Sequence, residues 1–576
     1  MTASPLRRCC LGLLCFCLGL SLPPGTLAQD IDVPSVTDTY ALEDVRVVQA
    51  PGQVIESATV VVRDGVIEAV GSNVDVPYDA RRVEDDSLVV YAGFIDGLSH
   101  AGVDTPDPED DQEADDPSDP PRDVAGIQPD RSVTSMLTPD DSDLGDLRKA
   151  GFTAAHVVPE GQMLPGAGAY VLYGGDTSDD MVLEADATLF AQIAGSDNFV
   201  YPSTDMAVIA QLRQLYREAE RRQSLETDYE QNPTGQPRPP RDPAHSAFFP
   251  VIDGQTPLAF YADSAVDIHR VLDLQRELGF PLVLAGLKDG FRTMDVLQQS
   301  DAPFFLTLDL PNKPESAVED TTLADTADAP AMHYDSDFCT ASYEDVSDEA
   351  ENLQLRHLME HQKYLEAAAT LDEAGLSFGF TTREADGGDI PEHLRTMVEN
   401  GLSEETALAA LTTRPASFLD LDDQLGTVEE GKMANLVVTD GPYFDADTEV
   451  KRVFVNGRQY DYTSDAAEGE ITGDVSKVLG TWSFTLETPG GELGGTLTFE
   501  GDESGLEGTI TIQGEEQDLE SISFDGSRLS FRVPSSQGPS FSVSVTVEGD
   551  TFEGTATAQG ESLNISGERT SGPDRR

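Results

Sequence analysis

The sequence predicts an α/β protein, because strand-like and helix-like segments alternate through its middle and strands dominate both flanks. Between residues 93 and 420, short apolar runs typical of buried strands alternate with stretches whose apolar residues recur every three to four positions. Such alternation is typical of parallel β/α folds, including (β/α) barrels. With 576 residues, the chain is long enough for two or three domains.

Individual elements of the middle region can be placed from these patterns. The expected strands lie at 153–158, 258–261, 282–285 and 304–308, and the expected helices at 264–278 and 404–411.

Strand-rich regions lie on either side of the middle region, at 40–92 and 421–462. In the first, Asp64-Gly65 separates two β-branched runs, which predicts a hairpin. In the second, Asn456-Gly457 marks a comparable turn.

The region 474–570 has alternating strand patterns, frequent Gly-containing turns and almost no helical periodicity. It predicts a small antiparallel β-barrel domain and resembles barrels of the lipocalin type. Trp482 is the only tryptophan of the chain and is expected to fill the inside of this barrel.

The first 28 residues read as a signal peptide. Arg7 and Arg8 form a basic start, an apolar run follows at 11–22, and Thr26-Leu27-Ala28 provides small residues for cleavage. We therefore expect an exported protein, periplasmic or extracellular, with no membrane span. Cys339 is the only cysteine left after cleavage, which rules out an intramolecular disulfide in the mature chain.

The charge of the chain is strongly negative, with 106 acidic against 36 basic residues and a net charge of −70. A surface of this sign repels nucleic acids and anionic membranes, so neither is an expected partner. The acidic residues are spread along the whole chain, as in proteins from high-salt environments, where ions screen the repulsion.

Two segments carry a specific resemblance. The first reads Gly93-Phe94-Ile95-Asp96-Gly97-Leu98-Ser99-His100, and the second extends from 401 to 438 through Thr412-Thr413-Arg414-Pro415-Ala416. Together they resemble the amidohydrolase superfamily, particularly its imidazolonepropionase-like branch, over residues 40–460. The resemblance implies a (β/α)8 TIM-like barrel at 93–420, flanked by a split β-sandwich built from 40–92 and 421–462.

The resemblance also implies one or two divalent metal ions, most often zinc, held by histidines and an aspartate at strand ends. Two histidines spaced two apart on the first strand would point to the same face and share a metal. In this chain His100 is kept at the second of these positions. Other residues stand at the remaining ligand positions: Leu98, Tyr261, Gly286 and Thr381, with Thr382 as the alternative to Thr381. His100 is therefore the one candidate metal ligand that the motifs leave, and the favoured alternative is that it is a hydrogen-bonded residue of the pocket.

Two function hypotheses follow. One is an amidohydrolase-family enzyme acting on C–N bonds of cyclic amides or peptide-like compounds, with a largely eroded metal site. The other is a non-catalytic protein of the same fold that binds a ligand or an active paralogue. A small molecule is the expected partner in the first case, and a homo-oligomer is left open in both.

Three other histidines are candidate metal ligands. His357 and His361 flank Glu360 in an H-x-x-E-H pattern, which on a helix places both imidazoles on one face. No third ligand is evident there, which favours an ordinary solvated helix face. His156 falls within an expected strand and is interpreted as a packed core residue.

Overall fold

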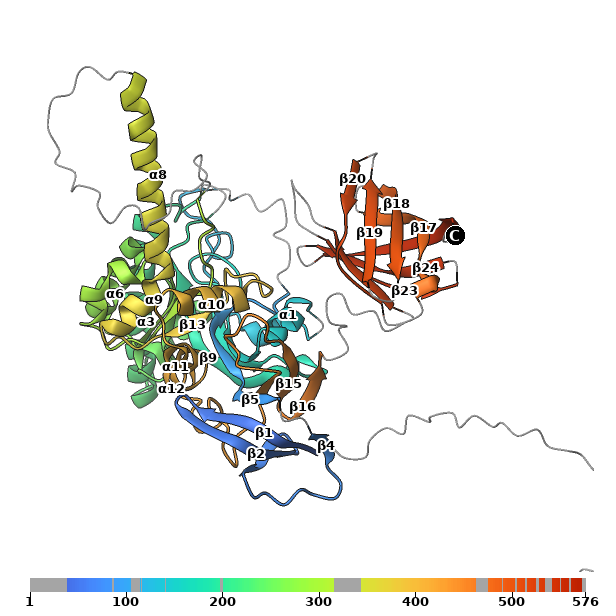
Figure 1. Ribbon diagram of the computed structural model, residues 1–576. Coiled ribbons are helices and arrows are strands. Elements are labelled where there is room, and N and C mark those ends of the chain that lie inside the picture. Colours follow the sequence, from blue (N-terminus) through green and yellow to red (C-terminus); the bar gives the residue numbers. More distant parts are fainter. Residues whose placement is uncertain are drawn as a thin grey trace, which may run out of the picture. The chain divides into compact units, whose positions relative to one another are not determined.

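We describe the fold from a computed structural model (Figure 1). The structure describes residues 39–314 with short gaps at 85–86, 105–113, 115, 140 and 197–199, then residues 343–462, and residues 475–571 with short gaps between strands. The predicted signal peptide and Cys339 lie outside the described residues. Among the helices that the structure describes, none is long and apolar enough to cross a membrane.

The middle of the chain forms an eight-stranded sheet whose strands follow one another in chain order. Its strands are β6 (Phe94–Ser99), β7 (Phe152–Val157), β8 (Gly166–Leu172), β9 (Val182–Gln192), β10 (Leu258–Tyr261), β11 (Leu282–Leu287), β12 (Phe304–Thr307) and β13 (Gly379–Thr381). The end strands β6 and β13 lie next to each other, so the sheet is nearly closed into a barrel. Apolar side chains from several strands, among them Ile95, Phe190 and Phe305, pack together on one face.

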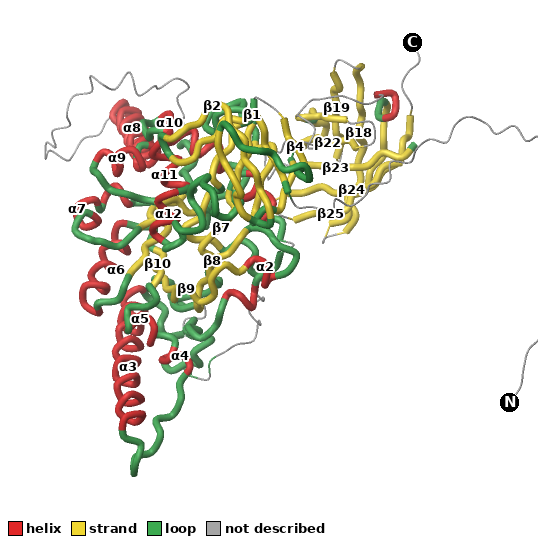
Figure 2. Tube along the Cα trace, turned by 90° about the horizontal axis from the view of Figure 1, so that it is seen from below, coloured by secondary structure: helices red, strands yellow, loops and turns green. Residues whose placement is uncertain are grey.

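Helices lie around the barrel strands, and one long helix projects away from them (Figure 2). They are α1 (Asp143–Lys149), α2 (Ser178–Met181), α3 (Asp205–Gln231), α4 (Pro243–Ser246), α5 (Phe249–Ile252), α6 (Ala265–Leu278), α7 (Met294–Leu297), α8 (Tyr343–Leu365), α9 (Ala367–Glu373), α10 (Ile390–Glu399), α11 (Glu404–Leu411) and α12 (Thr413–Phe418). Short 3-10 helices lie at η1 (Val133–Met136), η2 (Gly290–Arg292) and η4 (Val475–Lys477). The mixed α/β prediction is therefore confirmed.

The barrel sheet departs from the strict (β/α)8 repeat that was predicted. Strand β8 runs antiparallel to both β7 and β9, whereas the other neighbouring strands of this sheet pair in parallel. The segment Gly166-Ala167-Gly168-Ala169 begins β8, a strand that the apolar patterns do not predict. A Cβ on Gly168 would lie 2.7 Å from both His156 Nε2 and Thr188 Oγ1, so the missing side chain lets β8 lie across this pair.

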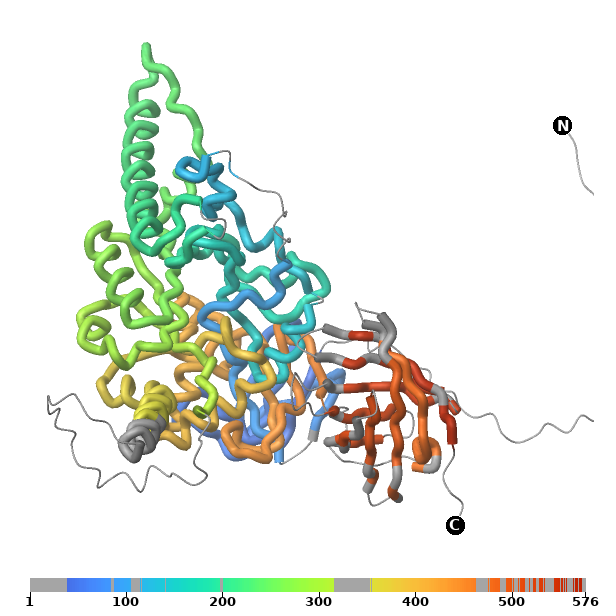
Figure 3. The backbone as a smooth tube through the Cα atoms, turned by 90° about the horizontal axis from the view of Figure 1, so that it is seen from above, coloured from blue at the N-terminus to red at the C-terminus, as the bar shows by residue number. Residues whose placement is uncertain are grey.

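A long arm extends from the barrel region. Helix α3 comprises 27 residues, and the chain returns along it through the proline-rich segment 233–243 (Figure 3). Arg222 donates a hydrogen bond to the carbonyl of Pro240, which fastens the returning segment to the helix.

A second eight-stranded sheet joins strands from both flanks of the barrel region. It contains β1 (Tyr40–Ala50), β2 (Gln53–Arg63), β3 (Val66–Gly71), β4 (Arg81–Glu84), β5 (Val89–Ala92), β14 (Leu436–Thr439), β15 (Val450–Val455) and β16 (Arg458–Asp461). The predicted hairpin turns at Asp64-Gly65 and Asn456-Gly457 join β2 to β3 and β15 to β16. The expected split sandwich is thus one continuous sheet, in which β5 pairs with β14 and irregular registers interrupt β1.

The C-terminal region forms a nine-stranded antiparallel sheet. Its strands are β17 (Gly480–Thr488), β18 (Gly491–Asp502), β19 (Gly505–Ile512), β20 (Glu515–Asp518), β21 (Glu520–Phe524), β22 (Arg528–Val533), β23 (Phe541–Glu548), β24 (Thr551–Ala558) and β25 (Glu561–Ser571). Each strand pairs with its chain neighbour except β20 with β21, and β17 pairs with β25. Trp482 is buried in the apolar core of this sheet and donates its indole N–H to the carbonyl of Val478 at 2.8 Å.

The barrel seam between β6 and β13 is held by side chains. Thr382 directs both its backbone N–H, at 3.0 Å, and its hydroxyl at the carboxylate of Asp96, which is fully buried. The neighbouring Thr381 hydroxyl donates to the carbonyl of Leu98, and Tyr173 adds a longer contact to Asp96 at 3.4 Å. Burial raises the pKa of Asp96 to about 6, although hydrogen bonds from Thr382, Leu98 and Ser99 lower it.

The raised pKa of Asp96 predicts how stability depends on pH. The carboxyl takes up a proton more readily in the folded than in the unfolded chain, so folding stability falls as the pH rises from about 4 through 6. Relative to Asp96→Asn, which keeps the shape, the wild type should lose on the order of 3 kcal/mol between pH 4 and 7. Urea unfolding of both proteins over this range measures the difference.

The exposed Asp273 provides the control for that series, because its carboxylate is 70% exposed in an ion pair on α6. The Asp273→Asn curve should run parallel to the wild-type curve. A constant difference between wild type and Asp96→Asn across the range would contradict the prediction.

Candidate functional site

A cavity of about 450 Å³ opens at the carboxyl ends of β6, β7 and β13. In parallel barrels this edge of the sheet carries the functional site, because the loops that follow the strands meet there. The lining residues are Ser99, His100, Ala101, Val103, Asp141, Asp143, Asp146, Leu147, Glu160, Thr382, Arg383, Ala385, Asp386 and Gly387. We refer to it below as the mouth cavity.

Arg383 is the only arginine or lysine among these lining residues. Its guanidinium carbon lies 3.9 Å from the centroid of the Tyr261 ring, and its Nη2 donates to the Gln192 side chain at 2.9 Å. The side chain is 11% exposed, and burial lowers the pKa of the guanidinium, which nevertheless stays charged at physiological pH.

The remaining donors of Arg383 are not satisfied within the described part of the chain. Its Nε and Nη1 are buried without a hydrogen-bond acceptor. Glu384 forms an ion pair with Arg383, but its carboxylate lies 3.6 Å from Nε, which is beyond hydrogen-bond distance. Cation–π contact with Tyr261 stabilises the charge without accepting these N–H groups.

Tyr261 and Gly286 are two of the expected metal-ligand positions, and the structure brings them into contact. Gly286 has φ +81°, and a Cβ built on it would lie 2.1 Å from Tyr261 Cε2. The tyrosine ring therefore occupies the space that a side chain at position 286 would need. Burial raises the pKa of Tyr261, so its phenol stays protonated.

His100 lines the mouth cavity, as the motif predicts. Its Nδ1 lies 2.8 Å from the carbonyl of Val158, which can only accept, so Nδ1 carries the proton and the neutral ring presents an unprotonated Nε2. Burial, together with the nearby Arg383, lowers the pKa of His100 to about 4. The imidazole is therefore neutral at physiological pH and a weak base.

The other two expected ligand positions serve the barrel itself. Leu98 is fully buried in the cluster of strand side chains, and Thr381 bonds to its carbonyl across the seam. Thr382, the alternative position, bonds to Asp96. Each of these side chains thus has a structural contact of its own.

The mouth cavity does not fit a divalent metal. In the part of the chain that the structure describes, no three His, Cys, Asp or Glu side chains are grouped to hold a metal ion. His100 offers one imidazole nitrogen, and the guanidinium of Arg383 places a fixed positive charge beside it. A divalent metal ion bound to His100 would have this one imidazole as its histidine ligand and would be repelled by the adjacent guanidinium.

Carboxylates line another side of the mouth cavity. Asp143 and Asp146 belong to α1, Asp141 precedes that helix, and Asp386 follows β13. Burial raises the pKa of Asp143, and repulsion from Asp141, Asp146 and Asp386 raises it further. The pKa of Asp146 is raised by burial and then by Asp386. Lys149, also of α1, acts in the opposite direction and lowers the pKa of Asp146.

The remaining histidine predictions concern structural positions. His156 is fully buried and bonds to Thr188 at 2.7 Å, as expected of a core residue. On α8, Glu360 pairs with Arg292 at 2.6 Å, and His361 bonds to the carbonyl of Pro311. The H-x-x-E-H segment is therefore part of a helix surface, as favoured from the sequence.

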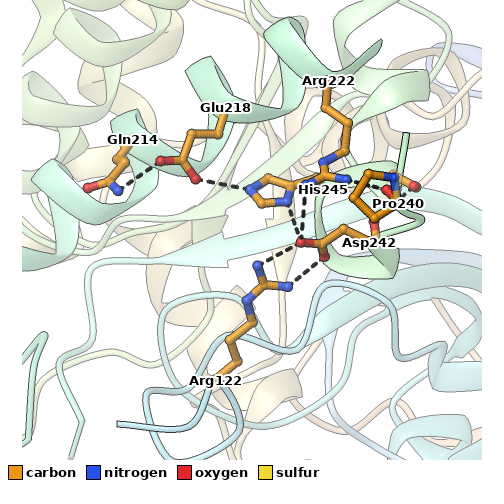
Figure 4. Close-up of polar contacts among 8 residues, drawn as sticks. Arg122, Gln214, Glu218, Arg222, Pro240, Asp242 and His245 are labelled. Carbon is orange, nitrogen blue, oxygen red and sulfur yellow. Dashed lines mark hydrogen bonds and ion pairs between the residues drawn. The ribbon is translucent and has the colours of Figure 1, made fainter. Parts of the chain in front are cut away.

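A second polar cluster lies beside the arm (Figure 4). His245 is buried between Asp242, 2.8 Å from Nδ1, and Glu218 of α3, 3.2 Å from Nε2. Arg122 binds the Asp242 carboxylate with two hydrogen bonds, which lower its pKa. The cluster ties α3, the segment before α4 and the loop after β6 together, and we assign it a structural role.

An α/β barrel-like sheet with a polar cavity at the carboxyl ends of its strands defines the class of barrel enzymes and their relatives. The model of the amidohydrolase family matches residues 318–460, and the predicted resemblance to the amidohydrolase superfamily is confirmed. The imidazolonepropionase-like branch stays a prediction.

A solved structure supports the fold. An amidohydrolase from Thermotoga maritima MSB8 is similar with a TM-score of 0.58 and 20% identity, covering 73% of this chain and 100% of that chain. A prolidase complexed with N-methylphosphonate-L-proline is more distant, with a TM-score of 0.42 and 17% identity over 73% of this chain and 99% of its own. No curated protein matches the chain.

The contact between Tyr261 and Gly286 predicts a large effect of Gly286→Ala. The new methyl group clashes with the ring, and the positive φ adds backbone strain. Gly279→Ala is the matched control, because Gly279 has φ +80° and open space around its Cβ position. We expect Gly279→Ala to cost roughly 1–2 kcal/mol of unfolding free energy and Gly286→Ala roughly 1–3 kcal/mol more.

The double variant Tyr261→Ala/Gly286→Ala separates the clash from the strain. In the Tyr261→Ala background, we expect Gly286→Ala to lower the free energy of unfolding no more than Gly279→Ala does. Chemical unfolding measures both differences. Equal costs for the two glycine variants in the presence of Tyr261 would refute the predicted contact.

Proposed function

We propose that this amidohydrolase-fold protein binds a small molecule in the mouth cavity without the divalent metal that the family implies. The observation that carries the proposal is Arg383, a fixed cation stacked on Tyr261 and bonded to Gln192 at the carboxyl ends of the strands. A cavity of about 450 Å³ with a few convergent polar groups is within the size range of small-molecule sites.

The chemistry of the mouth cavity favours binding over metal-assisted hydrolysis built on His100. Hydrolysis of a C–N bond needs a group that activates water and a group that stabilises the oxyanion. Arg383 has the charge for the second task. His100 is the one imidazole among the lining residues, and its pKa of about 4 makes it a poor proton acceptor.

Hydrolysis of C–N bonds, with a metal built around His100, is the second candidate. The match of the amidohydrolase family model to residues 318–460 favours it. It needs metal ligands beyond those that line the mouth cavity among the described residues.

Two further proposals concern where and with what the protein acts. The reading of residues 1–28 as a signal peptide supports export to the periplasm or the outside of the cell. An active paralogue or a second copy of the chain is the proposed protein partner. The net charge of −70 disfavours nucleic acid and anionic membranes as partners.

Metal analysis tests the proposal. Protein purified in high salt, analysed by plasma mass spectrometry before and after incubation with zinc and desalting, should contain no stoichiometric metal. Thermal shifts caused by small amides, amino acids and carboxylates should be unchanged by a chelator, because the site needs no metal.

Variants of two histidines sharpen this test. Stoichiometric zinc that His100→Ala removes, together with zinc-dependent amine release from an amide, would contradict the proposal and establish the hydrolase. His357→Ala is the control, because His357 is exposed on α8 and away from the residues that line the mouth cavity.

A further inference from the structure

The mouth cavity carries opposite charges on different lining elements. Arg383 follows β13 and lies over Tyr261, while Asp143 and Asp146 belong to α1. Asp141 and Asp386 add carboxylates around α1. A ligand that satisfies both kinds of group needs a negative and a positive end.

The need for a negative end comes from Arg383. Two of its guanidinium nitrogens are buried without an acceptor, and a buried donor left unpaired is costly. Glu384 is half-exposed and too far for a hydrogen bond, at 3.6 Å. The planar guanidinium is suited to a carboxylate, which can accept from two of its nitrogens at once. A small turn of the side chain towards the cavity that it lines would present these donors to a ligand.

The need for a positive end comes from the carboxylates. Asp141 already accepts backbone N–H groups from Gly102 at 3.1 Å and Asp143 at 2.9 Å, which holds its oxygens beside the cavity. Asp146 packs against Gly387, whose Cβ position lies only 3.0 Å from Asp146 Cβ, so the loop that carries Asp386 is close to α1. These like charges repel one another, and an ammonium group between them would relieve the repulsion.

We infer that the mouth cavity binds a zwitterionic small molecule, with its carboxylate on Arg383 and its ammonium group beside Asp141, Asp146 and Asp386. The inference rests on the proposed ligand-binding function and names the class of ligand. A purely anionic ligand would meet Glu160 and the four aspartates, and a purely cationic ligand would leave Arg383 unsatisfied.

Isothermal titration calorimetry with matched probes tests the inference. The zwitterions are 4-aminobutyrate and the longer 6-aminohexanoate, and the comparison compounds are butyrate, which lacks the ammonium group, and butylamine, which lacks the carboxylate. We expect at least one zwitterion to bind about tenfold or more tightly than either single-charge compound, because each end makes a charge-assisted contact.

Two variants test which residues bind the carboxylate and the ammonium group of the ligand. Arg383→Met keeps an apolar chain over Tyr261 and should weaken zwitterion binding by about tenfold or more. Arg292→Met is its control, because Arg292 also stacks on aromatic rings and pairs with a glutamate but does not line the mouth cavity. Asp146→Asn should weaken binding while leaving the melting temperature unchanged or higher, since it removes repulsion.

Three results would overturn the inference. They are binding of butyrate or butylamine as tight as that of the zwitterions, zwitterion binding unchanged in Arg383→Met, and no binding of any probe. If other compounds still produce chelator-resistant thermal shifts, the proposed function stands and only the zwitterion assignment fails. If stoichiometric zinc is found that His100→Ala removes, the proposed function itself fails.

Discussion

The contact between the Asp96 carboxylate and Thr382 is the constraint on which the barrel and its mouth depend. In the sheet order, β6 and β13 are the two end strands, and side chains rather than a strand ladder hold them together. Asp96 is buried at this seam, where its carboxylate lacks water and depends on hydroxyl and backbone donors. The same contact fixes the residue after Thr382, which is Arg383.

Arg383 links the seam to the chemistry of the mouth. Its guanidinium lies over Tyr261, and Tyr261 in turn needs the missing side chain of Gly286. The residues that stand at the expected metal-ligand positions are therefore related to one another by direct contacts. Tyr261 and Gly286 support one resident cation, while Leu98 and Thr381 meet in the seam through a hydrogen bond. The mouth is organised around a guanidinium and a neutral imidazole, which explains why we favour ligand binding.

Much of the fold could be predicted from local patterns. The strands at β10, β11 and β12 and the helices α6 and α11 follow apolar periodicity, and the Asp-Gly and Asn-Gly turns mark hairpins. Strand β8 was missed because its start is rich in Gly and Ala, which resembles a turn. It forms a strand because the small residues allow close approach to His156 and Thr188.

The candidate site could be predicted only in part. His100 was found because it stands in a recognisable motif. Arg383 was missed because nothing in its local sequence marks it, and its contacts with Gln192 and Tyr261 join residues far apart in the chain. The paired Asp-rich segments around α1 and after β13 were equally unremarkable in a chain with 106 acidic residues. Their proposed role in ligand binding becomes evident only from the cavity that both segments line.

Anomalous diffraction at the zinc absorption edge, from crystals soaked in zinc, tests most directly whether a guanidinium occupies the place of a metal. We expect no anomalous peak in the mouth cavity and electron density for the Arg383 guanidinium over the Tyr261 ring. A peak within bonding distance of His100 Nε2, with Arg383 turned away from Tyr261, would contradict this expectation.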